Sequence, residues 1–240
     1  MQECSYARLV RDICNILKQS NIHYTRKKVN SSYYISTRRS TVKLPKLDKN
    51  IAYLAGYILG DGCLIKSRRK KGGFYYELRI FSKNYKTLLY LGELFRETFG
   101  INPKIIKETR KPNVYFYLTI KNVVVFEYFS IIGLPTGKKE EYYVPTAVKN
   151  EKNLFLEFLA GLCDSDGHIR GQKIYIKQKS KMFIEDLINT CNKFDIQTSK
   201  IKVNFVNGKP YYYIWVERCY VPLRIKDTCR RSSAGRARDL

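Results

Sequence analysis

In this 240-residue sequence, two aspartates, Asp61 and Asp166, are the residues whose type and setting are best suited to catalysis. Each is followed by glycine and preceded by an apolar, glycine-containing segment, and they lie 105 positions apart (166−61). Carboxylate oxygens without nearby His or Cys suit a hard ion such as Mg²⁺, which keeps several waters and takes further ligands from phosphate. Ions held in this way activate water and stabilise the leaving oxygen in phosphodiester hydrolysis. The pair therefore predicts metal-dependent phosphodiester chemistry.

The segments that carry the two aspartates are copies of one pattern. Residues 54–62 read LAGYILGDG and residues 159–167 read LAGLCDSDG. The similarity continues downstream, where residues 80–84 align with 176–180 and each segment opens an amphipathic helix. Strands are predicted at 104–109 and 114–121 in the first copy and at 200–206 and 211–217 in the second. Each copy therefore reads helix, hairpin, helix, hairpin.

The helices that position the aspartates have small residues four positions apart, namely Gly56 and Gly60 in the first copy and Gly161 and Ser165 in the second. Residues at this spacing share one helix face and let a second backbone approach closely. We expect the two helices to pack along these faces and to end in glycines with the left-handed cap conformation. The aspartates would then lie side by side, where mutual repulsion and the helix dipoles call for a cation.

The charge of the chain indicates a polyanionic partner. Lys and Arg number 45 against 21 Asp and Glu, which gives a net charge of +24, and the sequence pI is about 9.7. Basic residues alternate with Tyr and Phe along strand-like segments, and no helix has a one-sided basic face, so nucleic acid is favoured and a membrane is not expected as a partner.

Cysteine and histidine usage narrows the class further. The seven cysteines are odd in number and never spaced as C-x-x-C, which argues against a disulfide framework and a zinc ribbon and indicates a reducing, intracellular compartment. A cytoplasmic or nucleoid-associated location is expected, with an organelle left open. Only two histidines are present, His23 and His168, so a histidine-centred nuclease motif is excluded.

The two nine-residue segments resemble the motif that names the LAGLIDADG homing endonucleases, over about residues 50–220. The resemblance implies an α+β fold of two pseudo-symmetric αββαββα-like repeats, whose antiparallel sheets form a DNA-binding saddle. It implies a monomeric, intron-encoded enzyme that hydrolyses both strands of a long double-stranded DNA site with Mg²⁺, for which Mn²⁺ can substitute, and leaves short 3′ overhangs. Asp61 and Asp166 occupy the position of the metal-ligating acid, whereas Asp164 occupies a position that is more often structural.

The same resemblance implies further site residues. A polar residue near the catalytic waters corresponds to Gln178 in the second copy and to Ser82 in the first. The lysines that follow them, Lys83 and Lys179, and Lys139 in the loop that closes the first repeat, are further catalytic candidates. Gly60 and Ser165, which precede the two acids, are added to the candidate metal site.

Strand alternation predicts the residues that contact DNA, because alternate residues share one face of a sheet. Ile201, Val203 and Phe205 are expected on the opposite, core-facing side of their strand. A two-stranded ribbon fits the major groove, where basic and amide side chains read bases or bind phosphate. The predicted contact residues are Tyr75, Glu77, Arg79, Lys173, Tyr175, Lys177, Lys200, Lys202 and Asn204.

The chain is expected to divide into a basic N-terminal extension (1–48), a first repeat (49–140), a second repeat (141–226) and a basic, disordered tail (227–240). The extension suggests a half-repeat, with a helix at 9–20 and strands at 24–28 and 32–37. The second repeat is expected to lack a terminal helix. An intein is disfavoured, because flanking splicing blocks are absent from the sequence. The alternative function is a non-cleaving nucleic-acid-binding module, such as a maturase whose partner is the host intron RNA.

Overall fold

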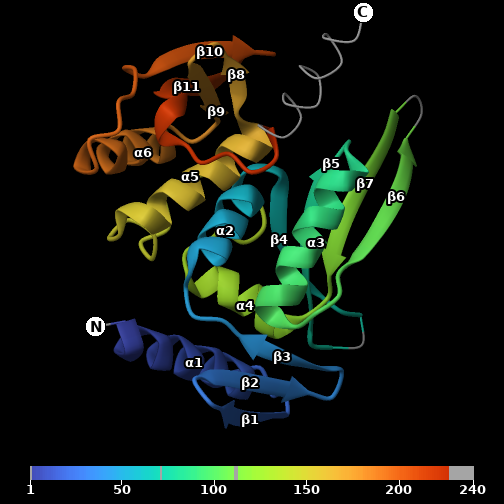
Figure 1. The fold of residues 1–240 in the computed structure, drawn as a ribbon. Helices are drawn as coiled ribbons and strands as arrows, with labels where there is room; N and C mark the ends of the chain where they lie inside the picture. The colour runs from blue at the N-terminus through green and yellow to red at the C-terminus, as the bar shows by residue number, and fades with distance from the viewer. Residues whose placement is uncertain (1, 71, 111–112, 227–240) are drawn as a thin grey trace, which may run out of the picture. The chain divides into compact units, whose positions relative to one another are not determined.

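The computed structural model describes residues 2–70, 72–110 and 113–226, which form two compact units (Figure 1). The first contains the described residues up to Ile51, with Asp61–Lys138 and Pro145–Ala147. The second contains Ala52–Gly60, Lys139–Val144 and the described residues from Val148 onward. Within the described chain, no helix is both long and apolar enough to cross a bilayer.

The first unit begins with helix α1 (Gln2–Gln19) and the antiparallel sheet β1 (Tyr24–Val29), β2 (Ser32–Thr37) and β3 (Ser40–Leu44). Buried residues on α1 recur every three or four positions, at Tyr6, Val10, Ile13 and Leu17, and form its core-facing side. Strand β3 was not predicted from the sequence. Residues 2–44 therefore form a helix and a three-stranded sheet, whereas the half-repeat interpretation stays a prediction.

The first repeat supplies α2 (Lys49–Asp61), β4 (Gly62–Arg68), β5 (Phe74–Ser82), α3 (Tyr85–Phe99), β6 (Lys104–Arg110), β7 (Asn113–Ile120) and α4 (Val123–Ile131). Its four antiparallel strands are ordered β4-β5-β7-β6. Helix α3 begins at Asn84, whose side chain accepts from the backbone N–H of Lys86, and ends at Gly100 with φ 66°. The predicted turn at 111–113 includes residues 111 and 112, which lie outside the described residues.

The second unit repeats this order with α5 (Lys152–Asp166), β8 (His168–Arg170), β9 (Lys173–Gln178), α6 (Lys181–Lys193), β10 (Lys202–Val206) and β11 (Lys209–Glu217). Its sheet is ordered β10-β11-β9-β8, which is the strand order of the first repeat read from the other edge. Asn207 and Gly208, with φ 50° and 72°, form the predicted turn between β10 and β11. The two-repeat α+β fold with antiparallel sheets is therefore confirmed.

After β11, the described chain contains only a short 3₁₀ turn, η1 (Arg218–Tyr220), where the first repeat has α4. The missing terminal helix of the second repeat was expected. The predicted disordered tail, 227–240, lies outside the described residues.

Helices α2 and α5 pack along their small-residue faces within the second unit, as predicted. A Cβ added to Gly56 would stand 1.9 Å from the carbonyl oxygen of Phe158, and one added to Gly161 would stand 2.0 Å from that of Tyr53. The two contacts are reciprocal, since each glycine meets the backbone of the other helix. Only glycine allows this approach, so the shared LAG sequence fixes the packing of the two helices.

The predicted left-handed cap at the end of α5 is wrong. Gly167 is extended, with φ −72° and ψ 141°, and its N–H donates to the carbonyl oxygen of Cys163. A Cβ at Gly167 would stand 2.5 Å from the same oxygen. Glycine is therefore required here for clearance against the preceding helical turn rather than for a positive φ. Gly62, which follows α2, opens strand β4.

The predicted core face of the segment 200–206 is also wrong. Strand β10 begins at Lys202 and pairs only with β11, and its residues are all exposed. Val203 is 49% exposed and Phe205 is 68% exposed. The alternation of apolar and polar residues remains, but β10 is an edge strand, so neither face of this strand is covered.

Candidate active site

Asp166 is the last residue of α5 and is held by a short chain of hydrogen bonds. The Gln178 amide, at the end of β9, donates from Nε2 to Oδ2 of Asp166 at 2.7 Å. The Tyr142 hydroxyl donates to Oε1 of Gln178 at 2.8 Å. Gln178 and Tyr142 are 9% and 5% exposed. The structure thus brings together Gln178 and Asp166, which the sequence had assigned to one site.

Tyr142 was not predicted as a site residue. Burial, and then the charge of Asp166, raise the pKa of the Tyr142 hydroxyl, so it stays a neutral donor. Because its hydrogen goes to Oε1 of Gln178, the amide is oriented with its Nε2 toward Asp166. No sequence signal links Tyr142 to Gln178, because they are 36 positions apart and lie in different elements.

Lys139 lies at the C-terminal end of α2. Its Nζ donates to the carbonyl oxygens of Ile58 at 3.2 Å, Leu59 at 2.5 Å and Gly60 at 3.0 Å. A cation at this end satisfies carbonyls that have no partner within the helix and interacts favourably with the helix dipole. Lys139 therefore compensates the end of the helix that carries Asp61. The carbonyl of Gly60, a metal-site candidate, accepts from this lysine.

Lys226 lies in the same way at the end of α5 and was missed in the sequence. Its Nζ donates to the carbonyl oxygens of Cys163 at 2.7 Å, of Ser165 at 3.3 Å and of Gly167. A lysine side chain therefore contacts the C-terminal end of each of the two motif helices. The sequence could have shown Lys226 only through the pseudo-symmetry, as a basic residue near the end of the second repeat that corresponds to Lys139 near the end of the first.

Asp164 fixes the segment that carries Lys226. Its carboxylate accepts from the backbone N–H groups of Arg224, Ile225 and Lys226 at 2.8, 3.0 and 2.9 Å, and from the Tyr53 hydroxyl at 2.8 Å. Asp164 is 4% exposed. These four hydrogen bonds satisfy a buried carboxylate within the protein, which agrees with the structural role that its motif position implied.

Ser165 and Gly60 lie next to Asp166 where the two helices end. The Ser165 hydroxyl donates to the carbonyl oxygens of Gly161 and Leu162, at 3.1 and 2.9 Å. A Cβ added to Gly60 would stand 2.0 Å from Ser165 Oγ and 3.4 Å from the carboxyl carbon of Asp166. Asp61 follows Gly60 as the last residue of α2.

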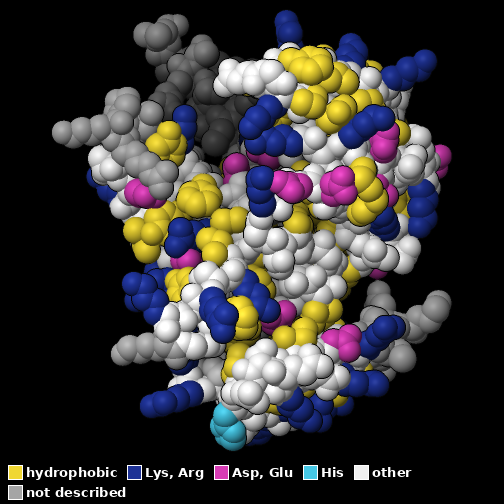
Figure 2. Space-filling view, turned by 180° about the vertical axis from the view of Figure 1, so that it is seen from behind, with side chains coloured by type: hydrophobic (Ala, Val, Ile, Leu, Met, Phe, Trp, Pro, Cys, Tyr) yellow, Lys and Arg dark blue, Asp and Glu magenta, His cyan; other side chains and the backbone are white. Residues whose placement is uncertain are grey.

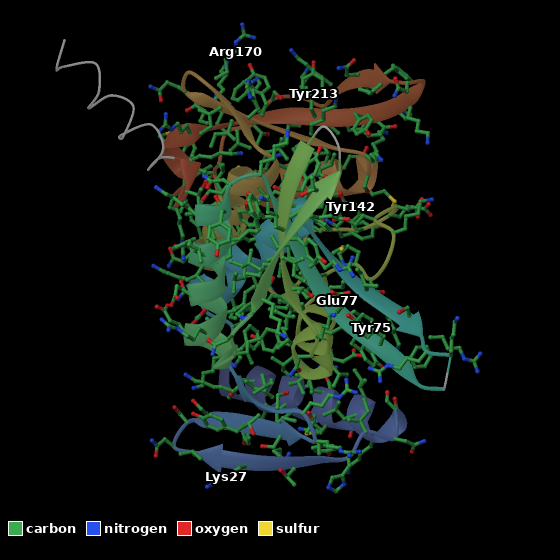
Figure 3. The ribbon with its side chains drawn as sticks, turned by 90° about the vertical axis from the view of Figure 1, so that its right-hand side faces the viewer. Lys27, Tyr75, Glu77, Tyr142, Arg170 and Tyr213 are labelled. Carbon is green, nitrogen blue, oxygen red and sulfur yellow. The ribbon has the colours of Figure 1, made fainter. Side chains whose placement is uncertain are left out.

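The sheet of the second repeat carries a face of paired basic and aromatic side chains. Lys173 Nζ lies 4.1 Å from the centre of the Trp215 ring, and Lys177 Nζ lies 4.6 Å from that of Tyr211. Strand register sets Tyr213 opposite Lys177 and Trp215 opposite Tyr175, so these aromatic residues share the predicted contact face (Figure 3 labels Tyr213). The register between distant strands is not readable from local sequence, which is why the aromatic residues of β11 were missed.

The remaining basic candidates of this repeat lie along the same sheet or beside it. Lys179 follows β9, and its Nζ lies 5.5 Å from the centre of the Tyr211 ring. Lys202 and Asn204 belong to the exposed β10, whereas Lys200 precedes that strand. Asn204 is paired with Tyr211 in the strand register.

The sheet of the first repeat carries Tyr75, Glu77 and Arg79 on one face of β5, and Figure 3 shows Tyr75 and Glu77 along this strand. Glu77 is only 1% exposed, because it forms an ion pair of 2.7 Å with Arg79 and accepts from the Thr119 hydroxyl at 2.6 Å. Burial alone would raise the pKa of Glu77, but the hydrogen bonds from Arg79 and Thr119 outweigh it and lower the pKa.

The Glu77 carboxylate is therefore covered on this face, and a DNA contact by Glu77 stays a prediction. Its carboxylate holds the half-exposed Arg79, whose guanidinium lies 5.3 Å from the centre of the Tyr117 ring. Lys83, the catalytic candidate of the first repeat, lies 6.0 Å from the centre of the Tyr115 ring. Both sheets thus combine basic residues with aromatic rings, which suits phosphate and base contacts.

The surface view agrees with this composition. Figure 2 shows Lys and Arg side chains spread over the face in view, with hydrophobic side chains between them. A hydrophobic group with lysine or arginine around it lies at the end where Figure 1 shows β10, the strand of Val203 and Phe205.

Duplicated motif helices, two sheets of the same strand order and an aspartate at the end of each helix define a two-motif LAGLIDADG chain. The family model described as "LAGLIDADG-like domain" matches residues 48–133 and 154–227, one segment for each repeat. The chain belongs to this family, and the resemblance stated from the sequence is confirmed.

The chain is also similar to short parts of two larger proteins. The replication factor C small subunit of Methanocaldococcus jannaschii is 27% identical over 70% of this chain and 9% of its own length. The probable translation initiation factor IF-2 of the same organism is 30% identical over 72% of this chain and 14% of its own length. The chain thus spans a small part of these relatives.

Two solved structures of the homing endonuclease I-DmoI share the fold. The complex with DNA and Ca has a TM-score of 0.56 at 16% identity, and it covers 78% of this chain and 98% of that chain. The complex with DNA and Mn has a TM-score of 0.55 at 19% identity, with coverage of 71% and 90%.

Proposed function

We propose that the protein is a site-specific homing endonuclease that hydrolyses both strands of a long double-stranded DNA site and leaves short 3′ overhangs. The observation that carries the proposal is the duplication of a carboxylate at the end of a glycine-packed helix, each end compensated by a lysine. Family membership and the fold shared with DNA-bound I-DmoI support it. An intron-encoded monomer remains our expectation.

The residues at the helix ends fit a hard divalent ion. We propose that the carboxylates of Asp61 and Asp166 are the protein donors, with water and phosphate completing the shell. Among the described residues, no group of three or more His, Cys, Asp or Glu side chains could hold a metal ion. Mg²⁺ suits such oxygen ligands, and Mn²⁺ is the expected substitute; DNA complexes of I-DmoI with Ca and with Mn support divalent-metal use. A bound ion would supply Lewis acidity for the attack of water and for departure of the leaving oxygen.

The chain's own residues then have distinct roles. Gln178 holds one oxygen of Asp166 and so sets the orientation of the carboxylate. Lys139 and Lys226 keep positive charge at the helix ends, where it also opposes the negative charge that develops on a phosphate. Lys83 and Lys179 stay as catalytic candidates, and Gly60 and Ser165 as candidates for the metal site. The sheet faces, with Arg79, Lys173 and Lys177, bind the duplex.

Each aspartate is proposed to serve the cleavage of one strand. The two halves differ, because Gln178 in the second corresponds to Ser82 in the first. Serine is shorter than glutamine, so we expect Ser82 not to hold the Asp61 carboxylate in the way that Gln178 holds Asp166. The two strands should therefore be cut at different rates, and a nicked duplex should accumulate as an intermediate.

The test begins with a randomised duplex library that is incubated with the protein and Mg²⁺, after which the cut ends are sequenced. On the site found in this way, neither Asp61→Asn nor Asp166→Asn should still cut both strands of the duplex. Asp195→Asn is the matched control, because it removes an exposed carboxylate at a residue with φ 57°, a conformation that Asn tolerates.

Double-strand cleavage that persists in both aspartate variants would contradict the proposed chemistry. Wild-type protein that binds structured intron RNA but cuts no duplex would support the maturase alternative instead. Both results leave the fold assignment intact, because it rests on the family match and the strand order.

A further inference from the structure

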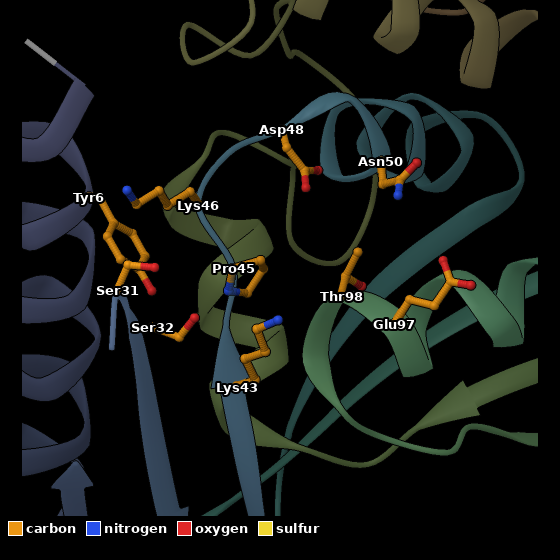
Figure 4. Close-up of a pocket in the computed structure, with 10 residues that line it drawn as sticks. All are labelled: Tyr6, Ser31, Ser32, Lys43, Pro45, Lys46, Asp48, Asn50, Glu97 and Thr98. Carbon is orange, nitrogen blue, oxygen red and sulfur yellow. The ribbon is translucent and has the colours of Figure 1, made fainter. Parts of the chain in front are cut away.

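Two cavities border the N-terminal sheet inside the first unit, and their charges differ. One, of about 240 Å³, is lined by two lysines and two acids together with neutral residues (Figure 4). The charged residues are Lys43, Lys46, Asp48 and Glu97. Positive and negative side chains balance there, so this cavity has no preference for an anion.

The other cavity, of about 300 Å³, is lined by basic residues without any acid. Its cations come from three separate places: Arg38 and Arg39 at the β2–β3 turn, Arg69 between β4 and β5, and Lys121 just before α4. Cations gathered from distant parts of the chain, with no acid in the lining, form a site of positive potential, which favours an anionic ligand.

The lining of this second cavity also includes apolar residues and one tyrosine whose hydroxyl is unsatisfied. Ile22, Phe74, Tyr76 and Val123 line it beside the basic residues. Tyr76 is 7% exposed, and its hydroxyl has no hydrogen-bond partner in the described part of the chain. A buried hydroxyl without a partner is unfavourable. A cavity lined by apolar side chains and cationic groups together suits a sugar that carries phosphate.

Phe74 and Tyr76 line the cavity from the face of β5 opposite to Tyr75, but two cations of the lining also lie near the Tyr75 ring on the predicted DNA-contact face. Arg69 and Lys121 both belong to the cavity lining and lie 5.9 and 5.7 Å from the centre of the Tyr75 ring. A hydrogen bond with Tyr75 raises the pKa of Lys121, so this lysine keeps its charge at neutral pH. A duplex that contacts Tyr75 therefore has cationic residues immediately beside it.

The arginines of the β2–β3 turn belong to a part of the chain that the family model does not match. That model begins at residue 48, whereas Arg38 and Arg39 precede it. Thr37 and Ser40 pair with each other, so the two arginines occupy a tight two-residue turn, and both are exposed. The N-terminal extension thus adds its cations at the margin of the first repeat's sheet.

We propose that this basic cavity binds the sugar-phosphate backbone of double-stranded DNA, so that residues 1–48 lengthen the DNA contact of the first repeat. The inference rests on the proposed function only in that its partner is duplex DNA. It does not depend on cleavage. Binding to a random-sequence duplex without Mg²⁺ therefore tests it separately from the active site.

The experiment compares two double variants of the full chain that remove equal charge from the N-terminal extension. Arg38→Ala with Arg39→Ala alters the cavity, whereas Arg8→Ala with Arg11→Ala, the matched control, alters the exposed side of α1. Affinity for a fluorescein-labelled duplex of random sequence is measured over a range of salt concentrations. Thermal unfolding of each variant establishes that the fold is unchanged.

Each lost phosphate contact should make the slope of log affinity against log salt less negative by about 0.9. At about 0.15 M salt, one such contact corresponds to about a fivefold loss of affinity, so loss of both arginines should weaken binding by about 5- to 30-fold. The α1 control should keep the wild-type slope.

Equal slope changes in the two double variants would overturn the proposal, because net charge alone would then explain them. An unchanged slope in the Arg38 and Arg39 variant would overturn it as well. A loss seen with structured RNA but not with duplex DNA would also refute it, since the cavity would then serve another partner. A protein that shows the expected slopes but never cuts DNA would refute only the proposed endonuclease function.

Discussion

The substitution Tyr142→Phe removes the hydroxyl and so tests whether this group fixes the orientation of the Gln178 amide. The hydroxyl donates to Gln178 Oε1 at 2.8 Å, while Nε2 of the same amide donates to Asp166 at 2.7 Å. Without the hydroxyl, Oε1 becomes a buried acceptor without this donor, and the amide can rotate. The rotated amide would place an oxygen against the Asp166 carboxylate, where it repels rather than holds it.

A buried polar group left without its partner costs about 1–3 kcal/mol. If about 1–2 kcal/mol of this cost is added to the activation free energy, cleavage of the strand that depends on Asp166 slows by about 5- to 30-fold. The other strand should keep its rate. Tyr142→Phe should therefore lengthen the lifetime of a nicked duplex in which one defined strand is still intact.

The assay is single-turnover cleavage of a duplex that carries a different label on each strand, with Tyr143→Phe as the matched control. Tyr143 is 51% exposed, and its hydroxyl lies 3.9 Å from the sulfur of Met182. Equal slowing of both strands by Tyr142→Phe would refute the reasoning, because it would indicate a general loss of structure. A full additional loss from Tyr142→Phe in a Gln178→Ala background would also refute it, since the hydroxyl would then act independently of the amide.

Two further predictions concern stability. Gly161→Ala should lower the free energy of unfolding by roughly 3 kcal/mol or more, because its Cβ would stand 2.0 Å from the Tyr53 carbonyl oxygen. The control is Gly92→Ala within α3, where the new Cβ makes ordinary contact. In the same urea titration, this variant should raise the free energy of unfolding by about 0.5–1 kcal/mol. An unfolding midpoint of Gly161→Ala equal to that of wild type would show that the helices can separate freely. Glu127 is 5% exposed, and burial raises its pKa despite the charge of Lys66. The native state therefore holds this proton to higher pH than the unfolded state does. Stability should fall as the pH rises from the unfolded-state pKa of Glu127 to its native-state pKa. Glu127→Gln should remove this part of the pH dependence and raise stability above it by about 1 kcal/mol, as measured by urea unfolding at pH values from 4.5 upward; a variant with the wild-type pH profile would contradict it.

Local sequence predicted those features that depend on residues close together in the chain. The duplicated LAG segments predicted the close packing of α2 and α5, because the requirement for small residues at Gly56 and Gly161 is visible in their spacing. The turn at Asn207 and Gly208 was likewise readable, since both positions need a positive φ.

Features that depend on long-range contacts could not be predicted in this way. The orientation of Gln178 depends on Tyr142, and the burial of Glu77 depends on Thr119 of another strand. Alternation predicted which face Glu77 occupies but not that the face is closed at this point. The exposure of Phe205 was missed for a related reason, since alternation cannot show that a strand lies at the edge of a sheet.

A lysine compensates the C-terminal end of each motif helix, but the residues around that lysine differ between the two repeats. At the end of α5, buried Asp164 holds the backbone of residues 224–226 and so places Lys226 against the last carbonyls. The first motif has Leu59 at the corresponding position; it is 1% exposed and packs in the core, yet Lys139 reaches the carbonyls of α2. The feature common to both halves is therefore the lysine, not the second acid. Because each lysine offsets the negative end of a helix dipole, an aspartate is tolerated at each end within the fold itself.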